Sequence, residues 1–276
     1  MTPDPFHHLG AVAKLHPGMT RGNNEDSILL YPGRGCFAVA DGMGGGACGE
    51  IASKIVIESV HRRIRQSEWG PSMRECAVIQ SAYGANSYIA SIITRRKLKS
   101  MGSTLVCLLF DSWNYASAAI FHAGDSRCYR FRRKRLECLT QDHSLANAKG
   151  KGKGGREIRP GILTNAIGST GDFFLERTAV EVKRDDLFLL CSDGLSGMLP
   201  EKVIAGELAA HPSVESAAEA LLALALERGG RDNISLILIQ VSSVPPRYLP
   251  TEEELLADSA CRDQSLRELA DTEITQ

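Results

Sequence analysis

Three aspartates stand at the ends of apolar segments that lie far apart in the sequence. Asp41 closes the segment CFAVAD, Asp193 closes LFLLCSD, and Asp232 opens DNISLILIQV. Each segment is short, bounded by turn residues and rich in Val, Ile, Leu and Phe, which indicates a buried strand. Carboxylates gathered on one rim of a sheet repel one another and shift their pKa values unless a cation lies between them. The pattern predicts either a divalent metal site or three independent turn and cap aspartates, and spacing alone leaves both interpretations open.

The residues around these aspartates offer oxygen ligands, with no histidine or cysteine at matching positions. Hard oxygen ligands suit Mg²⁺ or Mn²⁺ rather than Zn²⁺. Asp41 is followed by GMGGG, where the missing side chains let the backbone approach an ion, so the Gly42 carbonyl is a candidate ligand. A phosphate-cradling glycine loop is the alternative for this run, although a lone glycine run is a weak signal.

An arginine precedes the first of these strands, in the string RGNNED at 21–26. The planar guanidinium of Arg21 matches two phosphate oxygens and suits a phosphate clamp, although an arginine taken alone is more often a surface residue. Two metals sharing an aspartate lower the pKa of a bridging water and neutralise charge on a phosphoryl group. The chain has no GxSxG string and no Cys in a CxxxxxR frame, so it shows no nucleophile for covalent catalysis.

The composition is that of an ordinary folded protein. The chain has 276 residues, 43% of them apolar and 24% charged, with a formal net charge of −1. This balance permits a full hydrophobic core and gives no overall attraction to nucleic acid or to an anionic membrane. We expect a cytoplasmic protein, because no apolar run approaches ~20 residues and the N-terminal segment lacks the features of a signal peptide. Eight cysteines without a CxxC pair are expected to be reduced.

Strands and helices are expected in blocks rather than in strict alternation. Helical patterns cover roughly 49–66, 72–97 and 214–227. Blocks of this kind favour an α+β fold with antiparallel sheets and separate helix layers over a parallel doubly wound sheet. Strand patterns occur at roughly 26–31, 36–41, 103–110, 115–123, 127–131, 135–139, 175–182, 186–192 and 234–241.

Two stretches depart from these patterns. Residues 147–161 are rich in Gly and basic residues and are interpreted as a flexible surface loop. The segment after Val241 begins with Pro245-Pro246 and continues as an acidic amphipathic stretch. We interpret it as a linker followed by a loosely held helix outside the core, and a solvated tail is favoured over a docking segment.

Ordered together, these pieces resemble the PPM/PP2C family of metal-dependent protein serine/threonine phosphatases, in particular its bacterial members. The resemblance covers about residues 15–241 and favours the metal site over three independent aspartates. The matching strings, in the order that the family has, are RGNNED at 21–26, VADGMGG at 39–45, GST at 102–104, HAGDSRCYR at 122–130, LTQDHS at 139–144, LLCSDGL at 189–195 and GGRDNISLILI at 229–239.

The resemblance implies a four-layer α-β-β-α sandwich of two antiparallel sheets flanked by helices, with the site at one end. It implies a phosphatase domain over residues 1–243, with a flap at about 144–166, followed by an acidic tail over 244–276.

The resemblance also assigns roles to individual residues of this sequence. The metal ligands are Asp41, Gly42, Asp193 and Asp232, with Asp125 joining Asp193 at a third, weaker metal. Arg21 binds phosphate, Glu25 or Asp26 acts through metal-bound water, and Asn233 orients the Asp232 loop. The cofactors are Mn²⁺ or Mg²⁺, with two core ions and a third.

Some positions depart from the family pattern. Met43 replaces the histidine that animal members carry as a proposed general acid, and Gly46 stands where many bacterial members have histidine. His143 and His122 are weak candidates for the proton donor, because core or turn histidines are the more frequent interpretation. The Gly- and Lys-rich flap leaves substrate selectivity open.

The predicted function is hydrolysis of phosphoserine and phosphothreonine on proteins by a metal-activated water. The alternatives are another two-metal phosphoester hydrolase, such as a nuclease using the basic run RFRRKR at 130–135, or a non-catalytic phosphoprotein-binding module. The expected partners are phosphorylated proteins, including a cognate Ser/Thr kinase or its targets, with no nucleic acid and no membrane. We expect a monomer.

Overall fold

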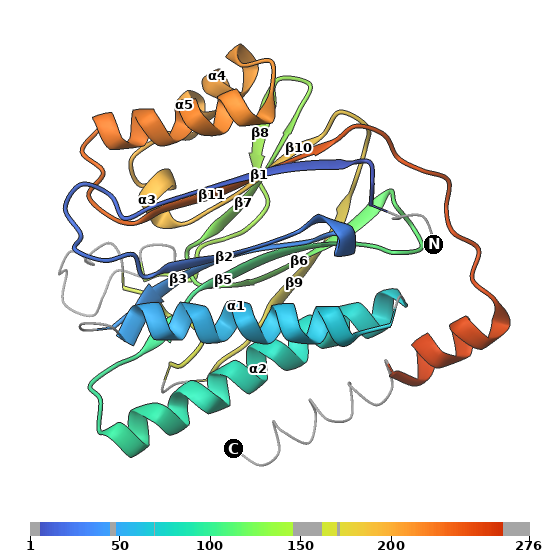
Figure 1. Ribbon diagram of the computed structural model, residues 1–276, viewed down its shortest axis with the longest axis horizontal. Helices are drawn as coiled ribbons and strands as arrows, with labels where there is room; N and C mark the ends of the chain where they lie inside the picture. The colour runs from blue at the N-terminus through green and yellow to red at the C-terminus, as the bar shows by residue number, and fades with distance from the viewer. Residues whose placement is uncertain (1–5, 45–47, 69, 146–161, 170–171, 262–276) are drawn as a thin grey trace.

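The computed structural model describes residues 6–44, 48–68, 70–145, 162–169 and 172–261. Two antiparallel sheets stack face to face, and helices cover their outer faces (Figure 1). The predicted four-layer α+β sandwich is therefore confirmed. The Gly- and Lys-rich loop at 147–161, predicted to be flexible, lies outside the described residues.

The first sheet has the order β1-β11-β10-β7-β8. All its described neighbours are antiparallel, and His16 of β1 pairs with Ile234 of β11. The sequence analysis did not predict β1. The strands are β1 (Leu9–His16), β7 (Arg127–Arg132), β8 (Arg135–Cys138), β10 (Leu187–Cys191) and β11 (Ile234–Val241).

The second sheet has the order β2-β3-β5-β6-β9, with the short strand β4 paired to β3. It is also antiparallel, and its register places Asp26 directly opposite Asp41. The strands are β2 (Asp26–Tyr31), β3 (Cys36–Met43), β4 (Gly102–Ser103), β5 (Leu105–Phe110), β6 (Ser117–Ala123) and β9 (Glu176–Glu181).

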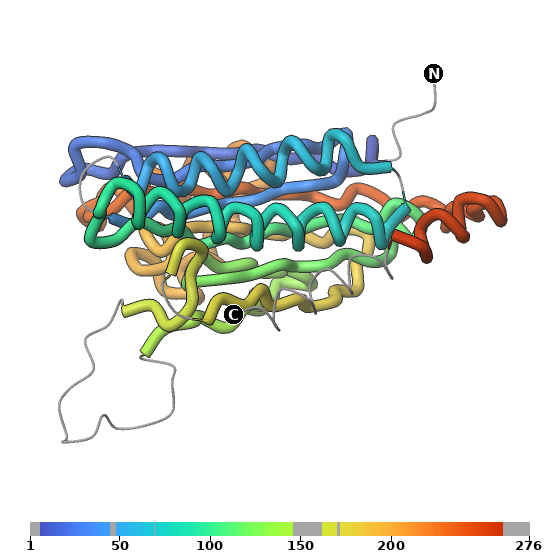
Figure 2. The backbone as a smooth tube through the Cα atoms, turned by 90° about the horizontal axis from the view of Figure 1, so that it is seen from below, coloured from blue at the N-terminus to red at the C-terminus, as the bar shows by residue number. Residues whose placement is uncertain are grey.

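Helices form the two outer layers. The long helices α1 (Cys48–Gln66) and α2 (Pro71–Arg96) lie side by side over the second sheet (Figure 2). The shorter helices α3 (Asp193–Ser196), α4 (Glu201–Ala210) and α5 (Val214–Glu227) cover the first sheet. A 3-10 turn over Pro32–Arg34 joins β2 to β3. The sequence analysis did not predict α4.

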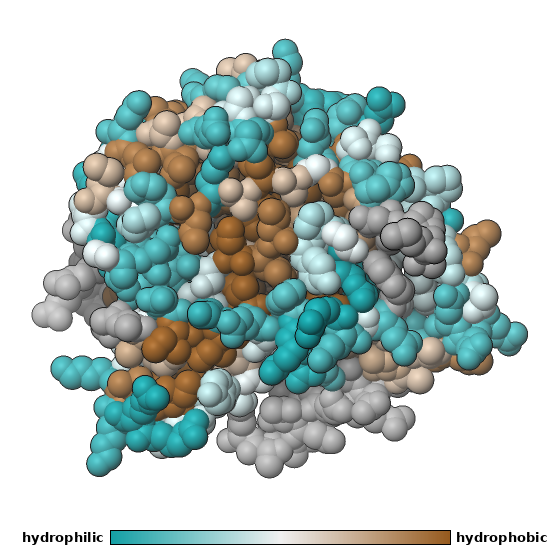
Figure 3. Space-filling model, in the orientation of Figure 1, coloured by the Kyte–Doolittle hydropathy of each residue, from teal (hydrophilic) through white to brown (hydrophobic). Residues whose placement is uncertain are grey.

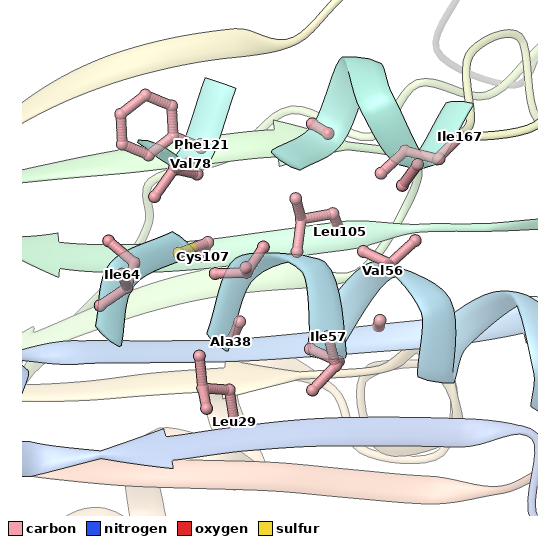
Figure 4. Close-up of a cluster of buried hydrophobic side chains, with 14 of the residues drawn as sticks. Leu29, Ala38, Val56, Ile57, Ile64, Val78, Leu105, Cys107, Phe121 and Ile167 are labelled. Atoms are coloured by element: carbon pink, nitrogen blue, oxygen red, sulfur yellow. The ribbon is translucent and has the colours of Figure 1, made fainter. Parts of the chain in front are cut away.

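The continuous apolar strands divide their side chains between two cores, because successive residues of a strand point to opposite faces. In β5, Leu105, Cys107 and Leu109 pack against the α1 and α2 layer, whereas Val106 and Leu108 pack between the sheets. Figure 4 shows the first of these cores, with side chains from α1 and α2 meeting those of the sheet. A third core lies between the first sheet and α3, α4 and α5. Strands buried on both faces hold their ends rigidly, which is what a site on the rim requires.

The C-terminal segment is attached to the domain at a defined point, unlike the solvated tail favoured by the sequence analysis. A helix covers residues 252–261, and Thr251 and Glu254 cap it reciprocally: Thr251 N donates to Glu254 Oε2 over 2.7 Å, and Glu254 N donates to Thr251 Oγ1 over 3.3 Å. Asp258 is only 6% exposed, and its Oδ1 accepts a hydrogen bond of 3.0 Å from Met73 N in the first turn of α2. The predicted helix is present, and it contacts the first turn of α2.

Candidate metal centre

The predicted carboxylates meet at one end of the sandwich, on the left side of Figure 1. Asp41 lies on β3 opposite Asp26, the first residue of β2. Asp193 follows β10 and begins α3, and Asp232 lies two residues before β11. Because β10 and β11 are antiparallel neighbours, the end of one strand and the start of the other share this rim. The fold therefore gathers residues that lie up to about 200 positions apart in the sequence.

Close backbone approaches shape the floor of this rim. A side chain at Gly42 would place its Cβ 2.1 Å from the Gly49 carbonyl oxygen and 2.5 Å from that of Glu25. A Cβ at Gly194 would lie 1.9 Å from the Asn233 carbonyl oxygen. These positions require glycine because two chain segments pass each other without room for a side chain. Steric crowding thus explains why glycine follows aspartate both in β3, at 41–42, and at the start of α3, at 193–194.

The carboxylates raise one another's pKa values. Burial, followed by the charges of Asp26, Asp193, Asp125 and Asp232, raises the pKa of Asp41 well above its usual range. Burial and then the charge of Asp193 raise the pKa of Asp125 to about 7. Burial raises the pKa of Asp26 to about 6, although Ser235 donates a hydrogen bond to it. Burial and the charge of Asp232 also raise the pKa of Asp193.

This arrangement fits a divalent cation. Asp26 Oδ1 and Asp193 Oδ1 are buried and have no hydrogen-bond partner within the described residues. Unpartnered carboxylate oxygens in a cluster that already repels itself are costly unless a cation supplies the missing interaction. The donors are carboxylates and backbone carbonyls, which are the ligands that Mn²⁺ and Mg²⁺ accept.

Arg21 also reaches the rim. Its Nη2 donates to Asp232 Oδ2 over 2.7 Å, and its side chain is 50% exposed. The Asp232 carboxylate, first by hydrogen bonding and then by charge, raises the pKa of Arg21. The sequence analysis assigned Arg21 to phosphate, and the structure adds a contact to a predicted metal ligand.

Asn233 connects three chain segments at the rim. Its Oδ1 accepts from Glu25 N over 2.8 Å, and its Nδ2 donates to the carbonyls of Pro17 and Asn23, each over 2.9 Å. Its own backbone N donates to Asp232 Oδ1 over 2.8 Å. The side chain thus fastens the Asp232 turn to the loop that carries Glu25. Burial raises the pKa of Glu25, with a smaller contribution from the charge of Asp232.

The sequence analysis missed two residues that hold Asp41 in place. Thr104 Oγ1 accepts from Asp41 N, and Thr104 N donates to the Asp41 carbonyl, both over 2.9 Å. Ser126 Oγ lies 2.7 Å from Thr104 Oγ1 and is fully buried. Both residues lie inside strings that the family resemblance had matched, GST at 102–104 and GDSR at 124–127. Those strings were the available signal.

A second cluster of titratable side chains lies beside the turn that carries Asp125. His122, His143 and Glu176 each offer one ligand atom within 4.8 Å of the others. His143 Nδ1 accepts from Gly124 N over 3.2 Å and contacts Asn165 Nδ2 at 3.0 Å. The Asn165 amide is oriented by its hydrogen bonds to Phe174, so its Nδ2 is the donor in that contact.

These contacts argue against a metal at the second cluster. Two donors on Nδ1 place the ring proton of His143 on Nε2, which then donates to Glu176 Oε2 over 3.0 Å. A metal on Nε2 would move that proton to Nδ1, where it would face the N–H of Gly124. Burial lowers the pKa of His122 to about 4, so it is neutral at physiological pH. His122, neutral and buried, does not suit the role of proton donor that the sequence analysis considered.

Comparisons with known proteins agree with the fold. The family model described as protein phosphatase 2C matches residues 22–229. The chain is 32% identical over 240 residues to the serine/threonine protein phosphatase PstP of Mycobacterium tuberculosis, covering 84% of this chain but 45% of PstP, so it spans about half of that relative's length. It is 28% identical over 253 residues to the serine/threonine phosphatase stp of Listeria monocytogenes, covering 84% of this chain and 96% of stp.

Two solved structures are similar over most of the chain. PppA of Pseudomonas aeruginosa, described as a regulatory component of a type VI secretion system, superposes with a TM-score of 0.77 at 31% identity, covering 84% of this chain and 97% of that one. The catalytic domain of PstP in complex with two manganese ions gives a TM-score of 0.71 at 32% identity, covering 84% and 97%.

These relatives are named as serine/threonine phosphatases, and the catalytic domain of PstP was solved with two manganese ions. The chain belongs to the protein phosphatase 2C family. The predicted family is therefore confirmed. Within the described residues, no helix is both long and apolar enough to cross a membrane.

Proposed function

We propose that this chain removes phosphate from phosphoserine and phosphothreonine in proteins, using water as the attacking group and Mn²⁺ or Mg²⁺ as cofactor. The observation that carries the proposal is the rim of mutually repelling carboxylates with unpartnered oxygens on Asp26 and Asp193. The products are the free hydroxyl side chain and inorganic phosphate. The two manganese ions bound by the catalytic domain of PstP support the choice of metal.

Different residues of the chain would hold the metal ions and the phosphate. Asp41 and the Gly42 carbonyl would hold one ion, Asp41 with Asp193 and Asp232 a second, and Asp125 with Asp193 a third, weaker one. When bound, the ions supply Lewis acidity that lowers the pKa of water and offsets charge on the phosphoryl group. Arg21 would orient the phosphate, because its half-exposed guanidinium stands at the open side of the rim.

Supporting residues preserve this geometry. Asn233 holds the Asp232 turn against the Glu25 loop, and Thr104 holds the backbone of Asp41 on both sides. Glu25 lies close enough to Asp232 and Arg21 for their charges to affect its pKa, which supports a role for Glu25 in acting on solvent at the rim.

The nuclease alternative has less support. Two arginines of the basic run at 130–135 are committed to ion pairs: Arg130 with Glu137 over 2.5 Å, and Arg132 with Asp186 over 2.5 Å. The run forms the β7–β8 hairpin, which leads away from the rim. A groove for nucleic acid would need unpaired cations beside the carboxylates.

We further propose that the substrates include a Ser/Thr kinase of the same cell or its targets, and that the protein acts as a cytoplasmic monomer. The proposed domain limits remain residues 1–243 for catalysis, with a flap at about 144–166, and 244–276 for the tail. The base of the flap is held by a bridge between Ser144 and Leu163.

Hydrolysis assays separate the candidate functions. We expect purified protein with Mn²⁺ to release phosphate from a phosphothreonine peptide and from p-nitrophenyl phosphate, and to leave DNA intact. Cleavage of DNA would favour another two-metal hydrolase. Phosphopeptide binding without release of phosphate, at any Mn²⁺ concentration, would favour the non-catalytic module.

A further inference from the structure

A groove of about 770 Å³ runs between the outer faces of α1 and α2, away from the carboxylate rim. Its α1 side carries Arg62, Arg63 and Arg65, all exposed. Its α2 side carries Tyr88, which is 54% exposed, and Gly84, where an added Cβ would meet nothing within 4 Å. The groove is therefore open enough to receive another segment of protein.

The charge of the groove is positive. Among the described side chains that line it, Glu58 is the single acidic residue. Arg63 donates to the neutral Gln80 side chain over 3.1 Å, and none of the three arginines forms an ion pair with a carboxylate of the described residues. Arginines elsewhere behave differently: Arg177, for example, contacts Glu75 over 2.6 Å. Figure 3 shows hydrophilic side chains over the C-terminal half of α1 and apolar ones over its first half.

Both apolar and cationic side chains line the groove, which restricts the kind of segment that can bind there. Ile55 and Tyr88 present apolar surface, and the arginines line the same opening. A helix that binds in such a groove needs apolar residues three and four positions apart and carboxylates on the flank that meets the arginines. The expected occupant is an acidic amphipathic segment.

The C-terminal helix brings such a segment close to the groove. The helix over 252–261 lies beside the start of α2, where Asp258 accepts from Met73 N (Figure 1). Tyr248 N donates to the Trp113 carbonyl over 2.8 Å and fastens the linker before it. From Met73 to Tyr88 the distance along α2 is about 22 Å, at 1.5 Å per residue. The fifteen residues 262–276 would cover about the same length if they formed a helix in the groove.

We propose that residues 262–276 of this chain bind in the groove between α1 and α2. Leu266, Leu269, Ala270 and Ile274 recur at helical spacing in that segment, which provides the apolar stripe. Residues 268–276 carry Glu268, Asp271 and Glu273 and no lysine or arginine. These carboxylates complement the three arginines, and the tether through Cys261 gives the segment an effective concentration on the order of mM.

Amide hydrogen exchange on the full chain tests this proposal. We expect the variant Arg62→Glu/Arg63→Glu/Arg65→Glu to exchange about fivefold faster at residues 80–88, because three exposed ion pairs are replaced by repulsion. The tail variant Glu268→Lys/Asp271→Lys/Glu273→Lys should show the same increase. Combining both triple changes should restore slow exchange, since the charges are then swapped.

The control reverses three exposed cations elsewhere. Arg133→Glu/Lys134→Glu/Arg135→Glu changes the β7–β8 hairpin by the same charge and should leave exchange at residues 80–88 unchanged. The proposal is overturned if the tail variant exchanges like the natural chain, or if the swapped chain is not rescued. It is also overturned if the protection grows with protein concentration and sedimentation shows dimers, because the occupant would then be a second copy.

Discussion

Two clusters of titratable side chains meet at the turn that carries Asp125, and they differ in what their hydrogen bonds leave unsatisfied. At the carboxylate rim, Asp26 and Asp193 each keep one buried oxygen without a partner among the described residues, and burial and neighbouring negative charges raise the pKa values of the group. In the histidine cluster, His143 uses both ring nitrogens in hydrogen bonds. His122 keeps unpartnered nitrogens but stays neutral.

The difference teaches that proximity of ligand types does not define a metal site. The histidine cluster has the residues that zinc prefers, but its geometry holds the proton on the nitrogen that a metal would need. The carboxylates of the rim lack a positive charge that balances them, and a divalent ion supplies that charge. Metal removal, substitutions and changes of pH test this difference between the two clusters.

Removing metal should have the largest effect. We expect chelation of the purified protein to abolish phosphopeptide hydrolysis, a loss of at least ~10³-fold, because metal stabilisation contributes several kcal/mol to the transition state. Added Mn²⁺ should restore the rate. Full turnover after metal stripping would show that the rim does not need a cation.

The aspartates of the rim should differ in their effect on metal uptake. Asp193→Ala should remove more tight Mn²⁺ binding than Asp125→Ala, because Asp193 is assigned to two ion positions and Asp125 to one. Calorimetric titration of both variants measures this directly. Equal loss of the tight sites would contradict the assignment of Asp125 to the weaker ion.

Arg21→Lys should raise KM for a phosphopeptide and leave Mn²⁺ affinity nearly unchanged. Lysine keeps the charge but loses the planar fork, and a charge-assisted hydrogen bond contributes about 1.5–3 kcal/mol. Steady-state kinetics and calorimetry on the same preparation separate the two effects. If KM does not move while Mn²⁺ affinity changes, the contact of Arg21 with Asp232 is the one that matters.

The two clusters should respond to pH in opposite directions when metal is absent. Asp125, with a pKa raised to about 7 from a usual value near ~3.9, contributes stability that is complete below the usual value and is lost as pH rises through about 7. His122, with a pKa lowered to about 4, contributes stability that is present above ~6.5 and is lost as pH falls through about 4.

Urea unfolding in EDTA across pH 4–8 would measure these contributions. We expect Asp125→Asn to flatten the fall in unfolding free energy as pH rises from about 4 to about 7, and His122→Gln to flatten the fall as pH drops from about 6.5 to about 4. Mn²⁺ should remove the loss at high pH in the natural chain only. Curves that run parallel for all three proteins would show that neither group is linked to folding.

The smallest effect should come from His143. His143→Asn keeps an acceptor near the position of Nδ1 for Gly124 N, whereas His143→Ala removes it. We expect the alanine variant to lose about 1–3 kcal/mol of unfolding free energy and the asparagine variant to recover part of it. Zinc titration should give the same zinc affinity for both variants and the natural chain. A zinc affinity that depends on His143 would instead indicate that the second cluster binds metal.

Much of the site chemistry could be predicted because residue type is a local property. The aspartates at strand ends and the oxygen-only ligand set follow from short apolar runs and their boundaries. The α+β class followed from the order of blocks. The strand β1 was missed because LGAVAKLH is partly exposed along most of its length and contains Gly10 and Lys14, so its pattern is weak without its partner β11.

Other features depended on contacts between distant segments. The short helix α4 contains Gly206 and buries only Ile204 and Leu208 well. The helix therefore depends more on its packing against the first sheet than on the helix propensity of its residues. The hydrogen bond from Met73 N, at the start of α2, to Asp258 joins residues that lie 185 positions apart, so no local sequence pattern predicts it.

The sequence by itself determined which donors the protein owns: carboxylates, glycine carbonyls and one arginine in the right order, because these are fixed by residue identity. Tertiary structure decided which of them meet and in what protonation state. Two antiparallel sheets bring Asp26, Asp41, Asp193 and Asp232 to one rim, where burial and mutual repulsion raise the pKa values of the first three. The same packing fixes the proton of His143 on Nε2 and so separates a metal centre from a cluster that only resembles one.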